Sequence, residues 1–141
     1  MTITIISTSQ APDAKPIGKS ITLDTNWQVL VEVPSYEVPE ESFGGGTIVV
    51  PGVAEIISPL VVCNRSTVTR NFSIRVYRAE MDANFFIADT VSVPAKDTLF
   101  FPLNGQFIYT GDRLEITASD AAVIDVTLAF TVGQAEQDDV I

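Results

Sequence analysis

The sequence contains no histidine, and this absence excludes most of the chemistry that a small enzyme uses. Histidine is the usual general base, the commonest metal ligand and a member of every Ser-His-Asp or Cys-His arrangement. Carboxylate pairs remain, because Asp112 and Glu115 flank one candidate strand and Asp120 and Asp125 flank another. Each lies in a turn or on a polar strand face, where a solvated charge needs no special explanation. We therefore expect a protein that is not an enzyme and that has no catalytic residue, cofactor or metal site.

Cysteine and long apolar runs are also scarce. The single cysteine, Cys63, excludes a disulfide framework, and its place in an apolar strand favours a buried small hydrophobe over a reactive thiol. The apolar runs are far shorter than the roughly 20 residues of a membrane-spanning helix. The first ten residues, MTITIISTSQ, have no basic residue and no apolar core of a secretory signal. We expect synthesis in a cytoplasm and no membrane partner.

Positive charge is in short supply as well. Eight lysines and arginines face 18 aspartates and glutamates, so the formal net charge is −10. Such a surface repels phosphate backbones, and we expect no nucleic-acid partner. The candidates for a local basic patch lie on one predicted hairpin: Arg65, Arg70, Arg75 and Arg78. The patch is thin, because Arg75 shares the polar face of its strand with Tyr77 while Arg78 falls on the other face.

The sequence does contain many patterns typical of β-strands, and the clearest of them lie in the segment 56–78. Its first part, IISPLVVCN, is a nearly continuous apolar run, typical of a strand buried on both faces or at the centre of a sandwich. Its second part, from Asn71 to Tyr77, alternates between apolar and polar residues, so one face is core. Residues 65–69, which are polar except for Val68, lie between them. The sequence predicts a hairpin of two neighbouring strands.

Further strand patterns cover most of the chain. Pro102 demotes the run 99–103 to an edge or bulged strand, and Asn104-Gly105 is the strongest two-residue hairpin signal. Eight or nine strands at sandwich-like spacing, with no convincing helix, predict an all-β fold. An antiparallel two-sheet β-sandwich, jelly-roll-like, is favoured over a closed barrel because long irregular connections alternate with tight hairpins. The other expected strands are 27–33, 47–50, 85–93, 107–109, 113–118 and 124–132.

The expected domain organisation has three parts. Residues 1–18 form an extended N-terminal arm and linker, 19–133 the sandwich domain with a loop insertion at 35–46, and 134–141 an acidic tail. The alternating run at the start of the arm is a ready edge that could pair with a neighbouring subunit, or it could pack on its own domain. The acidic, glycine-rich insertion could bind a partner or a cation through Glu37, Glu40 and Glu41, or be a solvated loop.

Five stretches together resemble a known group of proteins. They are VVPG at 49–52, IISPLVVCN at 56–64, FSIRVYR at 72–78, VSVPAKDTLFF at 91–101, and TGDRLEITASDAA at 110–122 followed by IDVT. Their order and spacing resemble a group of small β-sandwich virion proteins encoded among the structural genes of tailed bacteriophages. The resemblance covers residues 47–132. The longer N-terminal part and the insertion at 35–46 depart from that group.

The resemblance implies a non-enzymatic structural subunit of a phage particle. It would be present in many copies in the tail, neck or collar, or decorate the capsid as a cement protein, in contact with itself and other virion proteins. It would be made in the host cytoplasm and located in the virion. The residue pattern places the candidate subunit interface on the arm and on the polar face of the alternating strand: Thr2, Ile3, Thr4, Ile5, Arg75 and Tyr77.

An alternative function is a module that binds carbohydrate or a host receptor. β-Sandwiches can display aromatic rings on which sugars stack, and the candidates are Trp27, Tyr36, Tyr77 and Tyr109. These four residues are scattered along the sequence.

Overall fold

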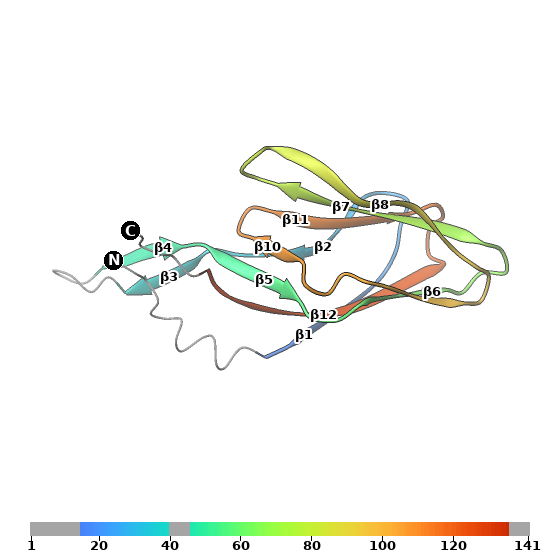
Figure 1. Cartoon of the computed structure of the whole chain (residues 1–141), viewed down its shortest axis with the longest axis horizontal. Helices are drawn as coiled ribbons and strands as arrows, with labels where there is room; N and C mark the ends of the chain where they lie inside the picture. The colour runs from blue at the N-terminus through green and yellow to red at the C-terminus, as the bar shows by residue number, and fades with distance from the viewer. Residues whose placement is uncertain (1–14, 40–45, 136–141) are drawn as a thin grey trace.

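The computed structural model describes residues 15–39 and 46–135, which form strands and connecting turns (Figure 1). The all-β expectation is confirmed, and no helix in the described residues is long and apolar enough to cross a membrane. The arm residues Thr2 to Ile5 and the glutamates Glu40 and Glu41 lie outside the described residues. The strands are β1 (Ile17–Thr22), β2 (Gln28–Glu32), β3 (Tyr36–Pro39), β4 (Thr47–Val50), β5 (Gly52–Ile56), β6 (Leu60–Asn64), β7 (Arg70–Arg78), β8 (Ala83–Val93), β9 (Thr98–Phe101), β10 (Phe107–Tyr109), β11 (Arg113–Ala118) and β12 (Ile124–Gln134).

The first sheet contains two strands that are interrupted midway. β5 and β6 follow one another along the same edge of β12, where Ile56 is opposite Phe130 and Val61 is opposite Thr127. On their other side, β10 pairs with β5 and β9 pairs with β6. β1 occupies the remaining edge of β12. Counting each interrupted strand once, the order across this sheet is β1, β12, β5–β6, β9–β10.

The second sheet has the order β2-β11-β7-β8, with every pair antiparallel. In chain order, with β5–β6 and β9–β10 each counted once and the separate β3–β4 pair left out, the first, eighth, third and sixth strands form one sheet and the second, seventh, fourth and fifth form the other. This alternation between two sheets is that of a jelly roll. The expected two-sheet sandwich of jelly-roll type is therefore confirmed.

The core lies between the two sheets and follows the alternation of the sequence. In β7 the side chains of Phe72, Ile74 and Val76 are buried, and in β12 alternate residues from Ile124 to Phe130 are buried in the same way. The ring of Phe72 meets Phe101 of β9 edge-on, with 6.0 Å between centroids. Each fully buried side chain of this size contributes about 1.5 to 3 kcal/mol through removal from water.

The predicted hairpin over 56–78 is wrong. β6 belongs to the first sheet and β7 to the second, so residues 65–69 cross from one sheet to the other. The apolar run is not one strand either, because it is interrupted at 57–59, where Pro59 has no N–H to donate. In β6 only alternate residues are buried, and Cys63 is half-buried on the outer face rather than in the core.

The Asn104-Gly105 signal gives a turn but not a hairpin. Gly105 has a φ of 95°, which favours glycine, and Gln106 N–H donates to Leu103 O at 3.2 Å. The strands on either side do not pair with each other, because both pair with β5–β6. The edge position expected from Pro102 is confirmed, since β9 is the outermost strand beside β6.

Part of the predicted loop insertion belongs to a third sheet, which has two strands. β3 and β4 pair as an antiparallel hairpin that extends away from one end of the sandwich (Figure 1). Gly52 stands at its base, where an added Cβ would lie 2.6 Å from the Tyr36 ring and 2.7 Å from Pro34 O. The Thr110 hydroxyl donates to Pro34 O at 3.0 Å and accepts from Gly52 N–H at 2.6 Å. The hairpin therefore packs against the sandwich because Gly52 leaves room for Tyr36 and Pro34, and the Thr110 hydroxyl bonds to both sides of the junction.

Candidate functional site

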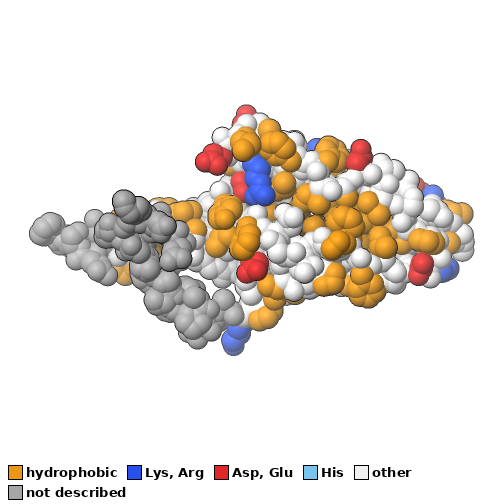
Figure 2. Space-filling model, in the orientation of Figure 1, with side chains coloured by type: hydrophobic (Ala, Val, Ile, Leu, Met, Phe, Trp, Pro, Cys, Tyr) orange, Lys and Arg blue, Asp and Glu red, His pale blue; other side chains and the backbone are white. Residues whose placement is uncertain are grey.

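Exposed aromatic side chains gather on one side of the sandwich. β8 and β9–β10 are the outermost strands of their sheets, and both face the viewer in Figures 1 and 2. We call this side the open edge. In the described residues, every aromatic side chain that is largely exposed belongs to these strands, with exposed fractions between 43% and 64%. Together with the adjoining Met81, the exposed side chains of the open edge are Met81, Phe85, Phe86, Phe100, Phe107 and Tyr109. They do not form one patch. Phe86 is paired with Arg75 and meets the Trp27 ring edge-on at 5.7 Å, so it lies on the outer face of the second sheet. Phe100, Phe107 and Tyr109 lie on the outer face of the first sheet, because their neighbours in the strands point inward.

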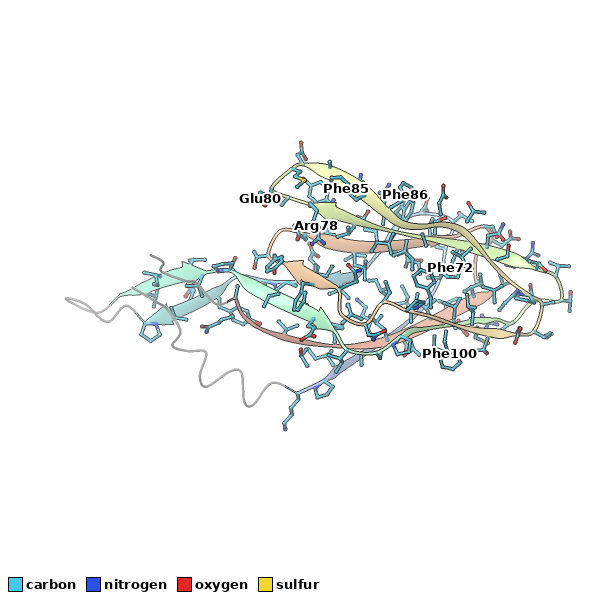
Figure 3. All side chains as sticks on the ribbon, in the orientation of Figure 1. Phe72, Arg78, Glu80, Phe85, Phe86 and Phe100 are labelled. Atoms are coloured by element: carbon cyan, nitrogen blue, oxygen red, sulfur yellow. The ribbon has the colours of Figure 1, made fainter. Side chains whose placement is uncertain are left out.

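A groove opens at one end of this edge, between the β7–β8 turn and the β10–β11 turn. It has a volume of about 960 Å³. Its apolar lining includes Met81, Phe85 and Tyr109, while Arg78 and Asp112 contribute polar atoms. Figure 3 shows Arg78, Glu80 and Phe85 at this end, with Phe86 beside Phe85 at the top of the view and Phe100 at the bottom, on the first sheet.

Asp112 holds the two turns of the groove together. Its carboxylate accepts from Arg78 Nη1 at 2.9 Å, from Ala79 N–H at 3.0 Å and from Tyr109 N–H at 3.2 Å. Arg78 also donates to Phe107 O at 3.0 Å. The carboxylate is 5% exposed as a residue, so these contacts replace the water that it lost on folding. The polar groups at the base of the groove, on Asp112 and Arg78, are therefore hydrogen-bonded to other residues of the chain.

Adjacent phenylalanines in the sequence are a signal for exposed rings at the open edge, one that the strand patterns alone do not give. Phenylalanines stand next to each other twice, at Phe85-Phe86 and Phe100-Phe101. Because successive side chains of a strand point to opposite faces, one member of each pair must leave the core. In the structure Phe101 packs against the core while Phe100 is 64% exposed.

The two strand residues of the predicted interface do lie on one face, the outer face of the second sheet. Arg75 donates through Nε to Glu115 Oε1 at 2.7 Å, and its guanidinium lies 4.0 Å from the centroid of the Trp27 ring. Arg113 donates to Glu115 Oε2 at 3.1 Å, and its guanidinium lies 4.2 Å from the Tyr77 ring. We call these five residues the arginine ladder. Cation–π contacts and charge-assisted hydrogen bonds link β7, β11 and the residue that precedes β2 across this face.

Titration of the arginine ladder is governed by these contacts. Burial alone would raise the pKa of Glu115, but the hydrogen bonds from Arg75 and Arg113 outweigh it and hold that pKa below its ordinary value. The Tyr77 hydroxyl donates to Asp82 at 2.6 Å, and this bond raises the pKa of Tyr77. Arg75 and Tyr77 thus have partners within the chain. Their role in a subunit interface stays a prediction.

The depressed pKa of Glu115 predicts a stability that depends on pH. A carboxyl whose pKa is lower in the folded state stabilises the fold above its ordinary value of 4.5, and this contribution is lost as the pH falls through the folded value. Glu115→Gln should lower the free energy of unfolding at neutral pH by about 1 to 3 kcal/mol, because the two arginines lose their carboxylate. Denaturant titrations should show the deficit shrinking below pH 4.5.

Glu55→Gln is the matched control for this prediction, because Glu55 is an exposed residue of β5. It should change the stability by no more than about 0.5 kcal/mol at either pH. A Glu115→Gln deficit that is the same at neutral and acidic pH would contradict the assignment of the ion pairs.

The carboxylates that sequence analysis considered as pairs are each bound by an arginine. Asp112 pairs with Arg78 and Glu115 with Arg75 and Arg113, as described above. Asp120 pairs with Arg70 at 2.9 Å, and Asp125 pairs with Arg65 at 2.7 Å. All five arginines of the sequence are therefore in ion pairs within the chain. Across residues 15–39 and 46–135, no three histidine, cysteine or acidic side chains are grouped so that they could hold a metal ion.

The four candidate sugar-stacking rings are not brought into one platform. Trp27 and Tyr77 belong to the arginine ladder, where a guanidinium covers one face of each ring. Tyr36 lies on β3 against Gly52, and Tyr109 lies at the open edge. These positions fall in three separate parts of the molecule.

The fold and surface define a jelly-roll β-sandwich with an aromatic open edge. No family model and no curated protein matches the chain. Among solved structures, the chain is similar to the N-terminal CBM22-1–GH10 modules of the endo-1,4-β-D-xylanase 10B of Clostridium thermocellum, complexed with xylohexaose. The identity is 15% and the TM-score 0.32, over 89% of this chain and 29% of that one. A likeness at this level carries no argument about what this chain does.

Proposed function

We propose that the protein is a non-enzymatic structural subunit of a tailed-phage particle, present in many copies and joined to neighbouring subunits through its open edge. Its place would be the tail, neck or collar, or the capsid surface as a decoration. The observation that carries the proposal is the concentration of all largely exposed aromatic side chains of the described residues on β8 and β9–β10. At the groove, Met81, Phe85 and Tyr109 line one apolar surface, and exposed apolar patches on soluble proteins mark interaction sites.

Two further considerations support this proposal. Aromatic side chains dominate the energetics of protein interfaces, because each removes a large apolar area from water. The jelly roll also occurs in viral capsid domains, although it occurs in lectins too, so this is an analogy at the level of fold. The five stretches between residues 47 and 132 supply the link to phage particles.

Particle composition tests the proposal directly. Phages carrying Phe100→Ser with Phe107→Ser should assemble particles that contain at least about tenfold fewer copies of the chain, since the contact loses two aromatic anchors. Quantitative mass spectrometry of purified particles gives the copy number. The matched control is Val49→Ser with Ile57→Ser, which removes two exposed apolar side chains away from the open edge.

Thermal melts of the purified variants must show that all are folded. Normal incorporation of the folded edge variant would contradict the assignment of the open edge as the contact. Absence of the wild-type chain from purified particles would contradict the proposed function itself.

A further inference from the structure

We infer that the groove receives an apolar side chain of a different protein, carried next to a lysine or arginine that meets the acidic β7–β8 turn. The inference rests on the proposed role of the open edge as a contact, and it names the chemistry of the partner at one place on that edge. Three features of the groove support it: a gap in the core, the hydrogen bonding at the base and the charge of the rim.

The groove is a place where the core is left unfilled. Phe85 is directly opposite Val76, a buried residue of β7, so both side chains point between the two sheets. Two residues further along β8, Ile87 points the same way and packs against the core. Phe85 is nevertheless 45% exposed, so the first sheet does not cover it. The groove of about 960 Å³ lies at that position and has room for an incoming side chain.

The walls of the groove are held in place by the chain itself. Asp112 bonds to both turns, and Gly111 lies so close to Ala79 that an added Cβ would come within 3.0 Å of the Ala79 Cβ. A preformed site loses less conformational freedom on binding than one that must first be ordered. Met81 lines the same groove and is 64% exposed, and its flexible thioether side chain can adapt to the shape of an apolar partner.

The base of the groove has few hydrogen bonds to give to a polar ligand. The carboxylate of Asp112 and the guanidinium of Arg78 are bonded to each other and to backbone groups. The hydroxyl of Thr110 bonds to Pro34 O and to Gly52 N–H. A sugar or nucleotide would leave many of its own polar groups unpaired here, which is costly. Burial of apolar surface is the main interaction that the groove can supply.

The rim of the groove is acidic. Glu80 is exposed in the β7–β8 turn and lines the groove, and Asp82 lies in the same turn. The cation that lines the groove, Arg78, is paired with Asp112. Because the whole chain has a formal net charge of −10, this end of the molecule attracts a positive partner and repels a negative one. The apolar side chain that enters should therefore have a lysine or arginine beside it.

A second copy of this chain fits the rim poorly. It has the same net charge of −10, so the two copies repel one another as a whole. Its arginines are also all in ion pairs of their own. A different protein, with a basic segment, is the better partner.

Selection from a random library of seven-residue peptides on the immobilised full chain tests the inference. We expect most enriched peptides to contain an apolar residue next to a lysine or arginine. In an NMR titration, one such peptide should shift the signals of Met81 and Tyr109. Phe85→Ser should raise its Kd at least about tenfold, because the groove loses an aromatic wall. Glu80→Lys should raise it at least about fivefold, because attraction at the rim becomes repulsion.

The matched controls are Val49→Ser and Glu37→Lys, which make the same kinds of change at exposed residues of the β3–β4 hairpin. Both should leave the Kd within about twofold of the wild-type value. Thermal melts must show that all four variants are folded.

Each contrary outcome points to a different failure. Absence of any enrichment, enriched peptides without the apolar and basic pair, or equal binding to Phe85→Ser would overturn the inference. Self-association of the wild-type chain that Phe85→Ser abolishes would show that a second copy is the occupant instead. None of these results depends on phage particles. Absence of the chain from purified particles would contradict the proposed function while leaving the peptide preference of the groove as measured.

Discussion

Asn64→Asp is expected to lower the free energy of unfolding by about 3 to 5 kcal/mol, enough to unfold many domains. Asn64 is fully buried at the end of β6. Its side-chain N–H groups donate to Val68 O at 2.9 Å, Val93 O at 3.0 Å and Pro94 O at 3.2 Å. Its Oδ1 accepts from the backbone N–H and the hydroxyl of Ser66 at 2.9 and 2.8 Å.

This amide joins two connections that cross between the sheets. Residues 65–69 lead from β6 to β7, and residues 94–97 lead back from β8 to β9. Aspartate keeps the shape of the side chain but replaces both donors with oxygen, so a buried carboxylate would face three carbonyl groups. Burial without a partner raises the pKa of a carboxyl, and the introduced group should therefore be protonated in the folded state.

Denaturant titrations across pH measure the effect and its sign. A carboxyl whose pKa is raised on folding destabilises the fold most at high pH, so the deficit of Asn64→Asp should shrink as the pH falls. Asn71→Asp is the matched control, because the half-buried Asn71 on β7 has one side-chain bond, accepted from Ser92 at 3.0 Å. The control should lose no more than about 1 kcal/mol. Equal losses in the two variants would contradict this account of Asn64.

Asp112→Ala is expected to cost about 2 to 4 kcal/mol, because it removes one partner of a buried, hydrogen-bonded ion pair. It leaves the guanidinium of Arg78 and the N–H groups of Ala79 and Tyr109 without their acceptor. Asp112→Ala should lower the free energy of unfolding of the whole domain, and it should also loosen the structure around the groove. Both walls of the groove depend on that carboxylate, so the groove should widen.

Hydrogen exchange resolves the local part of this prediction. In Asp112→Ala the amides of Ala79 and Tyr109 should exchange at least about tenfold faster than in the wild type, since one lost bond is worth about 1 kcal/mol or more. Glu80→Ala is the control, because Glu80 is an exposed residue of the same groove. Unchanged protection at both amides, or an equal change in the control, would refute the role given to Asp112.

The sequence predicted which residues face the core much better than it predicted which strands are neighbours. The alternation in 71–77 and 124–132 indicates directly which face of the strand each residue occupies. In both strands the apolar residues of the alternating pattern are the ones that face the core. Pairing is decided by residues far apart in the chain, so the short link 65–69 suggested a hairpin where the chain changes sheet. The strand at 36–39 was missed because its partner, β4, lies across the glycine-rich segment.

The candidate site was predictable only in part, because alternation gives the face of a residue but not its neighbours on other strands. Alternation placed Arg75 and Tyr77 on one face, but the groups that hold them come from other strands, and nothing local indicated Trp27 or Glu115. The open edge was within reach of sequence reasoning, because neighbouring phenylalanines in a strand cannot both be buried in one core. Which of them would be near each other in space required the topology.

The position of β12 has a consequence for how the chain is made. β12 follows all the other strands of the described residues in sequence but lies inside its sheet, between β1 and β5–β6. While the ribosome is still adding residues before Ile124, β1 and β5–β6 have emerged without the strand that joins them. Their unpaired edges and apolar faces are then available to other nascent chains. We expect the interval before β12 has emerged to be the time when this domain is most prone to aggregate, and when a chaperone would help it most.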